Sequence, residues 1–118
     1  MARIFTLRRK STLALRQRKE RLLHLLELCP DSLRASFVER YSVCGKRQCA
    51  CRHGGGKHGP FYYLTQCLGV GHINKFLLKS AAQQQAARKA IEHYRQFQEL
   101  LEELSQINTE LLRREEPL

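Results

Sequence analysis

Apolar residues near the start of the chain recur with a helical period. From about residue 8 to residue 28 the chain consists largely of good helix formers, and its leucines return every three or four positions. The resulting apolar stripe contains Leu15, Leu22, Leu25, Leu26 and Cys29. Because Pro30 cannot continue a helix, the pattern predicts one helix that ends just before it.

The middle of the chain changes to a pattern typical of strands. Residues 36–43 (SFVERYSV) are rich in aromatic and β-branched residues and predict a short strand. Residues 61–67 (FYYLTQC) and 72–78 (HINKFLL) have the same character, and the turn between them contains two glycines. Such a turn between two apolar runs is typical of a β-hairpin. We therefore expect three short antiparallel strands.

A single long helix is predicted from Ser80 to about residue 114. No Gly or Pro interrupts this stretch, and Ser80 is a suitable N-cap. The apolar residues alternate at spacings of four and three, so this face either packs on the chain's own core or pairs with another copy or a larger protein. The residues expected in such an oligomerisation interface are Tyr94, Phe97, Leu101, Leu104, Asn108 and Leu111.

Together these elements predict an α+β protein that forms one domain. We expect a basic N-terminal helix in residues 1–30, a zinc loop with a β-hairpin in residues 31–79, and a long C-terminal helix with coiled-coil spacing in residues 80–118. The 118 residues, 42% of them apolar, suffice for a modest core only. Metal binding or oligomerisation should therefore add to the stability of the fold.

Positive charge is concentrated in the first half of the sequence. Residues 1–60 carry 14 Lys or Arg against 4 Asp or Glu, whereas residues 61–118 carry 7 of each, so the net charge of +10 belongs to the first half. The densest run is Arg3, Arg8, Arg9, Lys10, Arg16, Arg18, Lys19 and Arg21, which only Glu20 opposes. Such a run is either a solvated face or a surface for a polyanion, and we favour the polyanion.

The chemistry of the chain centres on the stretch CGKRQCACRHGGGKHGP. It places Cys44, Cys49 and Cys51 close together and adds His58 or His53 as a fourth nitrogen ligand. Thiolate and imidazole are the ligands that zinc prefers, and a full tetrahedron leaves no position for a reacting water. His58 is favoured because the intervening glycines let the chain fold back, whereas His53 is only two residues beyond the last cysteine. A structural zinc site is predicted.

The same loop also presents cations that could contact phosphates. Phosphate contacts position a nucleic acid without reading its sequence, and they do not distinguish DNA from RNA. The residues that we expect to make them are Arg8, Arg9, Lys10, Arg16, Arg18 and Lys19 in the helix and Lys46, Arg47, Arg52 and Lys57 in the loop.

Aromatic residues of the predicted hairpin could stack on bases. Most of Phe61, Tyr62, Tyr63 and Phe76 are expected in the core, because one face of a small sheet must be buried. The outward set is expected to be Tyr62 with Lys75 and Lys79.

Several classes of protein are disfavoured by what the sequence lacks. There is no evident nucleophile–base set and no phosphate-binding glycine motif, so we expect no enzyme and no small-molecule substrate. No run of about 18 apolar residues indicates a membrane span. Five cysteines without an apolar signal segment favour a reducing, cytoplasmic setting.

The ordered set VERYxxCGKxxCxC, HGPFYYLT, a glycine-containing turn and IEHYRQFQELLEEL resembles a family of small bacterial and phage or mobile-element proteins known only as a domain of unknown function. The resemblance covers about residues 33–114. It implies a fold with a metal site and supports His58 as the fourth ligand. It also suggests an accessory or regulatory role beside the transposase or nuclease of a mobile element.

Three functions remain open at the level of the sequence. The favoured one is a zinc-stabilised nucleic-acid-binding protein, DNA-binding or RNA-binding. The second is an interaction adaptor that forms a homodimer, or docks on a larger partner, through the C-terminal helix. The third is a metal or thiol-redox sensor, which would require a labile metal site.

Overall fold

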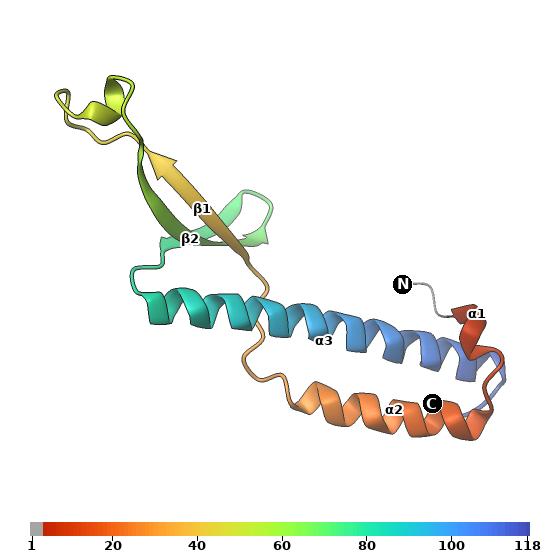
Figure 1. Ribbon diagram of the computed structural model, residues 1–118. Helices are drawn as coiled ribbons and strands as arrows, with labels where there is room; N and C mark the ends of the chain where they lie inside the picture. Colours follow the sequence, from red (N-terminus) through yellow and green to blue (C-terminus); the bar gives the residue numbers. More distant parts are fainter. Residues whose placement is uncertain (1–3) are drawn as a thin grey trace. The chain divides into compact units, whose positions relative to one another are not determined.

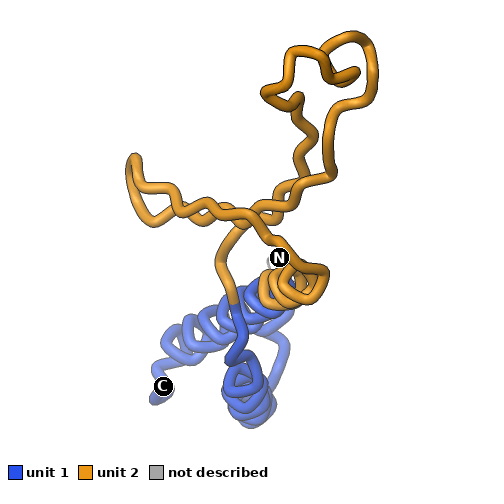
Figure 2. Tube along the Cα trace, turned by 90° about the vertical axis from the view of Figure 1, so that its left-hand side faces the viewer, with its two compact units in different colours: residues 1–32, 92–118 blue, residues 33–91 orange. Residues whose placement is uncertain are grey.

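In the computed structural model, which describes residues 4–118, the chain divides into two compact units (Figure 2). Unit 1 comprises the described part of residues 1–32 together with residues 92–118, and unit 2 comprises residues 33–91. Arg3 of the predicted basic run lies outside the described residues. The long C-terminal helix contributes to both units.

Unit 1 begins with two helices where the sequence predicted one. Helix α1 spans Ile4–Leu7 and helix α2 spans Thr12–Glu27. The break falls at Ser11, which has an extended backbone and accepts a hydrogen bond from the Ala14 N–H at 3.1 Å. Ser11 is therefore the N-cap of α2, a signal within the helical pattern that the sequence analysis did not use.

The core of unit 1 is formed by leucines of the predicted stripe and by the C-terminal part of helix α3 (Ala81–Arg113). Leu15 and Leu22 are fully buried with Ile107 and Leu111, and Leu7 of α1 closes the cluster. Within this unit α2 and α3 are antiparallel, since Thr12 contacts Arg114 whereas Arg18 contacts Glu103. The heptad face of α3 thus serves, at least in part, the chain's own core.

A buried ion pair fastens α1 to the end of α3. Glu110 is almost fully buried and accepts hydrogen bonds from the guanidinium groups of Arg113 (2.7 and 2.9 Å) and Arg114 (2.9 Å). Arg114 also donates to the carbonyl oxygens of Leu7 and Lys10 at 3.2 and 2.7 Å. Those carbonyls lie at the end of α1 and in the turn that follows, so Arg114 ties this segment to the end of α3.

Unit 2 contains the predicted three-stranded antiparallel sheet (Figure 1). Strands β1 (Ser36–Ser42), β2 (His58–Gly69) and β3 (His72–Leu77) lie in the order β1-β2-β3. The two turn glycines join β2 to β3 as a hairpin, and the α+β class is confirmed. β2 begins three residues earlier than predicted, because its first residues pair with the end of β1.

Helix α3 starts beside this sheet and covers one of its faces. Ser80 accepts a hydrogen bond from the Gln83 N–H at 3.0 Å, as expected of the predicted N-cap. Ala87 of α3 packs with Leu64 of β2 and Leu78 in the core of unit 2. None of the helices within residues 4–118 has the length and the apolar run needed to cross a bilayer.

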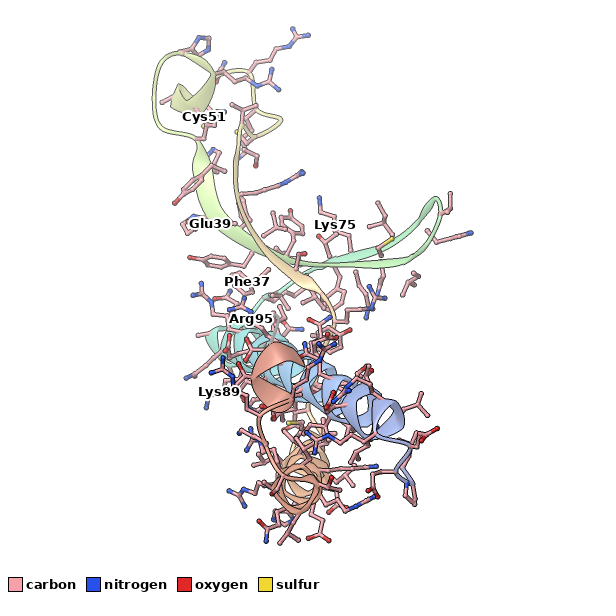
Figure 3. All side chains as sticks on the ribbon, turned by 90° about the vertical axis from the view of Figure 1, so that its right-hand side faces the viewer. Phe37, Glu39, Cys51, Lys75, Lys89 and Arg95 are labelled. Carbon is pink, nitrogen blue, oxygen red and sulfur yellow. The ribbon has the colours of Figure 1, made fainter. Side chains whose placement is uncertain are left out.

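The register decides which aromatic residues face this core. Phe37 and Tyr62 pack against the core from the face that carries Leu64, with their ring centroids 5.2 Å apart. Tyr63 and Lys75 lie on the opposite face, as strand alternation requires. Figure 3 shows Phe37 between the sheet and α3 and Lys75 on the far side of the sheet. The expectation that Tyr62 points outward with Lys75 is therefore wrong by one residue.

Candidate metal centre and cationic surface

The four predicted ligands come together in the loop between β1 and β2. Cys44 follows the end of β1, Cys49 and Cys51 flank the start of the short helix η1 (Ala50–Arg52), and His58 is the first residue of β2. Their ligand atoms all lie within 4.8 Å of one another, close enough to hold a metal ion. Figure 1 shows this loop at the end of the ribbon formed by β1 and β2.

Two of the distances between these atoms are close to those of a tetrahedral site. Cys44 Sγ lies 3.6 Å from Cys51 Sγ, and Cys49 Sγ lies 3.2 Å from His58 Nε2. Zinc–sulfur and zinc–nitrogen bonds of about 2.3 and 2.0 Å give tetrahedral edges of roughly 3.5–3.8 Å. The Cys44 N–H points at Cys51 Sγ at 3.4 Å, a contact that stabilises a thiolate. The donor set is therefore compatible with zinc.

The alternative fourth ligand is engaged elsewhere. His53 Nε2 forms a hydrogen bond with the carbonyl oxygen of Arg47 at 2.8 Å. That contact joins two residues within the loop, and the imidazole that lies with the three thiols is that of His58. The structure thus resolves the choice between the two histidines that spacing alone left open.

Two glycines let the loop fold this tightly. Gly55 donates its N–H to the Ala50 carbonyl oxygen at 2.7 Å, and a Cβ there would lie only 2.5 Å from that oxygen. Gly59 follows the ligand His58 with φ of 137°, and a Cβ there would meet the Arg40 carbonyl oxygen at 2.8 Å. Both positions therefore require glycine for steric reasons.

The cluster shifts the pKa values of its thiols in opposite directions. The Cys51 backbone, the Cys51 and Cys44 thiols and the His58 ring form hydrogen bonds with Cys49 that lower its pKa to about 6. A backbone hydrogen bond with Lys46 lowers the pKa of Cys44, but contacts with Cys49, burial and Cys51 outweigh it and raise the pKa. Cys49 is thus more readily deprotonated for metal binding than Cys44.

The other two cysteines take no part in the cluster. Cys29 is half-buried near the end of α2, where its Sγ donates to the Leu25 carbonyl oxygen at 3.6 Å. Cys67 is exposed near the end of β2, and its Sγ donates to the Gly69 carbonyl oxygen at 3.5 Å. Both were expected to be small core residues outside the ligand set; Cys29 is half-buried, whereas the exposure of Cys67 shows that the core expectation was wrong for this residue.

All four predicted cations of the metal loop are exposed. They are Lys46, Arg47, Arg52 and Lys57. Arg52 donates through Nε to the Cys44 carbonyl oxygen at 3.0 Å, so its guanidinium is held beside the first ligand. The ligand loop therefore presents positive charge around the cluster.

Net charge differs sharply between the two units. Unit 2 contains ten Lys or Arg and a single acidic residue, Glu39, which gives a net charge of +9. Unit 1 contains eleven Lys or Arg and ten Asp or Glu, which gives +1. Of the +10 in the first half of the chain, residues 1–32 of unit 1 carry +5 and residues 33–60 of unit 2 carry +5, and unit 2 reaches +9 through Lys75, Lys79, Arg88 and Lys89.

The predicted phosphate-binding residues of α2 are compensated within unit 1. Arg18 forms a salt bridge with Glu103 at 2.7 Å. Arg16 lies 3.6 Å from the Glu116 carboxylate, and Lys19 donates to the Leu118 carbonyl oxygen. The predicted Arg8, Arg9 and Lys10 are exposed at the end of α1 and in the turn that follows. The acidic C-terminal segment therefore masks the centre of the α2 cationic run.

The predicted oligomerisation residues are divided between the core and the surface. Leu111 is fully buried inside unit 1 and is not available to a partner, because α1 and α2 cover it. Leu104 packs at the edge of the same cluster, whereas Leu101 is 49% exposed. The remaining predicted residues, Tyr94, Phe97 and Asn108, are half-buried.

Comparison with known proteins identifies one family. Residues 13–68 match the family described as domain of unknown function (DUF6788). No curated protein and no solved structure matches the chain. The matched segment contains α2, β1 and the metal loop with its four ligands. The resemblance to a domain of unknown function is thereby confirmed for the segment that carries the candidate metal centre.

Proposed function

We propose that this protein is a zinc-stabilised nucleic-acid-binding protein. The observation that carries the proposal is the net charge of +9 on unit 2, the unit that also contains the four clustered ligands. A surface of that charge density attracts polyanions, and the phosphate backbone is the most common polyanion that proteins meet. The proposal assigns a binding role and no catalysed reaction.

Zinc is the metal that the donor set supports best. Three sulfurs and one imidazole within 4.8 Å of one another form the donor set that is typical of a closed structural site. In this role the ion would hold the loop between β1 and β2 and keep its four cations in place. Metal analysis of the purified protein tests this point, with one zinc per chain as the expected result.

Phosphate contacts are assigned first to the metal loop and only second to α2. Lys46, Arg47 and Lys57 have no acidic residue near them in sequence, whereas Arg16 and Arg18 form ion pairs with α3 and the tail. An internal ion pair must be broken or shared before its cation can bind phosphate. The loop cations are therefore expected to contribute more to affinity than the α2 cations.

A salt titration with two matched variants tests the proposal. Binding of a labelled duplex and a labelled single strand is measured by fluorescence anisotropy between 50 and 300 mM salt. If about six phosphates are neutralised, the logarithmic salt slope should be near −5 for duplex DNA. The triple variant Lys46→Gln, Arg47→Gln, Lys57→Gln should weaken binding more than Arg16→Gln, Arg18→Gln, Lys19→Gln. A flat salt dependence of the wild type would refute nucleic-acid binding.

A second candidate function, docking through α3, is supported by an exposed apolar groove in unit 1. Leu101, Leu112 and Leu118 line it and are 49–65% exposed. Asn108 lies in the same groove, and its Oδ1 is buried without a hydrogen-bond partner among the described residues.

Sedimentation analysis tests this second candidate. A homodimer should dissociate on dilution, and Leu112→Gln should shift it to monomer without changing the zinc content. A wild type that stays monomeric at high micromolar concentration would rule out the homodimer. The mobile-element setting suggested by the sequence resemblance stays a prediction.

The third function, a metal or thiol-redox sensor, requires that the four-ligand site binds its metal reversibly. A sensor must release its metal when its thiols are oxidised. Native mass spectrometry before and after mild oxidation distinguishes the two. Retention of the metal supports a structural site, and prompt release with disulfide formation supports a sensor.

A further inference from the structure

The face of the sheet that α3 does not cover carries its own set of aromatic and basic side chains. Strand alternation places Phe61 and Tyr63 of β2 on this face. Arg40 of β1 pairs directly with Phe61, and Lys75 of β3 lies beside Tyr63. We call these four residues the outer sheet face.

This face is open within unit 2. The core of the unit lies on the other side, where Phe37, Tyr62 and Leu64 pack toward α3. Phe61 is 37% exposed and lines a pocket beside the metal loop, Tyr63 is half-buried, and neither ring belongs to the cluster around Leu64. Lys75 is exposed. Figure 3 shows Lys75 pointing away from the helix side of the sheet. Two rings are therefore presented on a surface that the unit's own core does not need.

The charge of the outer sheet face has one sign. Arg40 and Lys75 are its ionisable groups, and Glu39, the only acidic residue of unit 2, lies on the opposite face. Lys75 Nζ lies 4.7 Å from the centroid of the Tyr63 ring. An apolar protein partner would have to desolvate both cations without a matching charge, whereas an anionic ligand would neutralise them.

We infer that the outer sheet face binds single-stranded nucleic acid by stacking unpaired bases on Phe61 and Tyr63. The inference rests on the proposed function and specifies its ligand. Accessible rings flanked by cations on one face of a sheet are an arrangement that binds single-stranded nucleic acids, because every base has a π-face and the phosphate backbone follows the positive charge. Bases of a duplex are already stacked on one another and cannot reach the rings.

The spacing of the two rings supports adjacent stacking positions. Phe61 and Tyr63 lie two positions apart along β2, which corresponds to about 7 Å. The β1–β2 ribbon continues from Phe61 into the metal loop, where Lys46 and Lys57 lie. A single-stranded nucleic acid bound across the two rings would therefore meet Lys75 at one end and the cations of the metal loop at the other, and both could contact its phosphates.

Ring-specific variants test the inference against a matched control. Phe61→Leu and Tyr63→Leu keep apolar bulk but remove the ring, and Phe76→Leu does the same on the other face at a similar exposure of 41%. Affinity is measured by anisotropy for labelled dT20, rU20 and a 20-base-pair duplex. Each outer-face variant should weaken single-strand binding by roughly 5- to 100-fold. Duplex binding should stay unchanged, and Phe76→Leu should change neither.

A fluorescent variant keeps the test informative if a leucine variant folds poorly. The chain has no tryptophan, so Tyr63→Trp introduces a single reporter on the outer sheet face, and Tyr94→Trp introduces one in unit 1. Addition of dT20 or rU20 should quench the first reporter and not the second. The comparison of dT20 with rU20 states whether DNA or RNA is preferred.

The outcomes separate this inference from the function on which it rests. Salt-dependent binding that is equal for single strands and duplex, and insensitive to the ring variants, overturns the outer-face inference and leaves the proposed function standing. Absence of any nucleic-acid binding by the wild type overturns both. A dimer that Phe61→Leu dissociates would show instead that a second copy covers this face.

Discussion

The two units of this protein carry nearly the same number of cations but use them differently. Unit 1 has eleven Lys or Arg and unit 2 has ten, yet their net charges are +1 and +9. In unit 1 the acidic end of α3 lies beside α2, so cations serve ion pairs such as Arg18–Glu103. In unit 2 a single glutamate is present, so most of its cations have no carboxylate of the same unit to pair with. The net charge of a unit is therefore a better guide to polyanion binding than its number of Lys and Arg residues.

The units also differ in what holds them together. Unit 1 has a leucine core and a buried Glu110–Arg114 pair. Unit 2 has the small cluster of Leu64, Leu78 and Ala87, and beyond its sheet the metal loop has one buried residue, Cys51. A loop with so little apolar burial needs another source of stability, and the proposed function assigns that role to a metal held by the four clustered side chains.

Removal of one ligand should produce the largest effect and should affect unit 2 alone. Structural zinc in small domains contributes about 10–16 kcal/mol of apparent binding free energy, so Cys49→Ser should abolish stable metal binding and disorder the loop. Hydrogen exchange should increase in the loop and the paired ends of β1 and β2, while α2 stays protected. Cys67→Ser, at an exposed position of the same unit, is the control. Retention of one zinc by Cys49→Ser would contradict a ligand role for this residue.

Loss of the buried carboxylate should damage unit 1 and leave the metal site intact. Glu110→Gln removes the charge that two guanidinium groups share, and the unpaired cations then remain in a partly buried site. We expect the melting temperature to fall by on the order of 10 °C with the zinc content unchanged. Glu115→Gln, at an exposed position, should have little effect. If both variants melt like the wild type, the pair does not stabilise unit 1.

The same carboxylate predicts how unit 1 responds to acid. Hydrogen bonds from Arg113 and Arg114 outweigh burial and lower the pKa of Glu110 from 4.5 to about 2. A lowered pKa in the folded state means that the stabilisation is complete above pH 4.5 and is lost as the pH falls toward 2. Thermal melts between pH 2 and 6 should therefore show a slope in the wild type that is reduced in Glu110→Gln. If the two proteins show parallel profiles of melting temperature against pH, Glu110 is not the origin of the acid sensitivity.

Removal of the carboxylates that pair with Arg16 and Arg18 should produce the smallest effect of the four changes, a modest gain in nucleic-acid affinity. Glu103→Gln with Glu116→Gln releases the salt bridges of Arg18 and Arg16. If the proposed function holds, affinity for a labelled strand at low salt should increase by about two- to fivefold, because partly exposed ion pairs are worth about 0.2–1 kcal/mol each. Glu99→Gln with Glu102→Gln, on the same helix, is the matched control. Equal gains in both variants would indicate a general charge effect.

Much of the fold could be predicted from local sequence. The strands in residues 36–43 and 72–78 and the long helix from Ser80 were identified because their signals lie within each segment. The break at Ser11 was missed because the helix-forming residues on both sides outweighed one N-cap. The division into units could not be predicted, since α3 contributes to two cores and packs in each against segments that are distant from it in the sequence.

The candidate site could be predicted to a similar extent. Cys44, Cys49 and Cys51 lie within eight residues, so their proximity hardly depends on the rest of the fold. The choice between His53 and His58 depended on loop closure, and His53 turned out to contact Arg47. Tyr63 was missed as an outward residue because FYYL offers an apolar side chain to either face. Only the pairing of β2 with its neighbours determines the parity of such a strand.

The sequence by itself determined the types of the elements, the three clustered cysteines and the excess of positive charge, because each depends on residues that are neighbours in the chain. The tertiary structure decided which cations are compensated, which face of the sheet is open and which apolar stripe of α3 is buried. These properties depend on contacts such as Arg18–Glu103 and Leu15–Leu111 between distant segments. Pairing over such separations is set by packing and register, which no local pattern specifies.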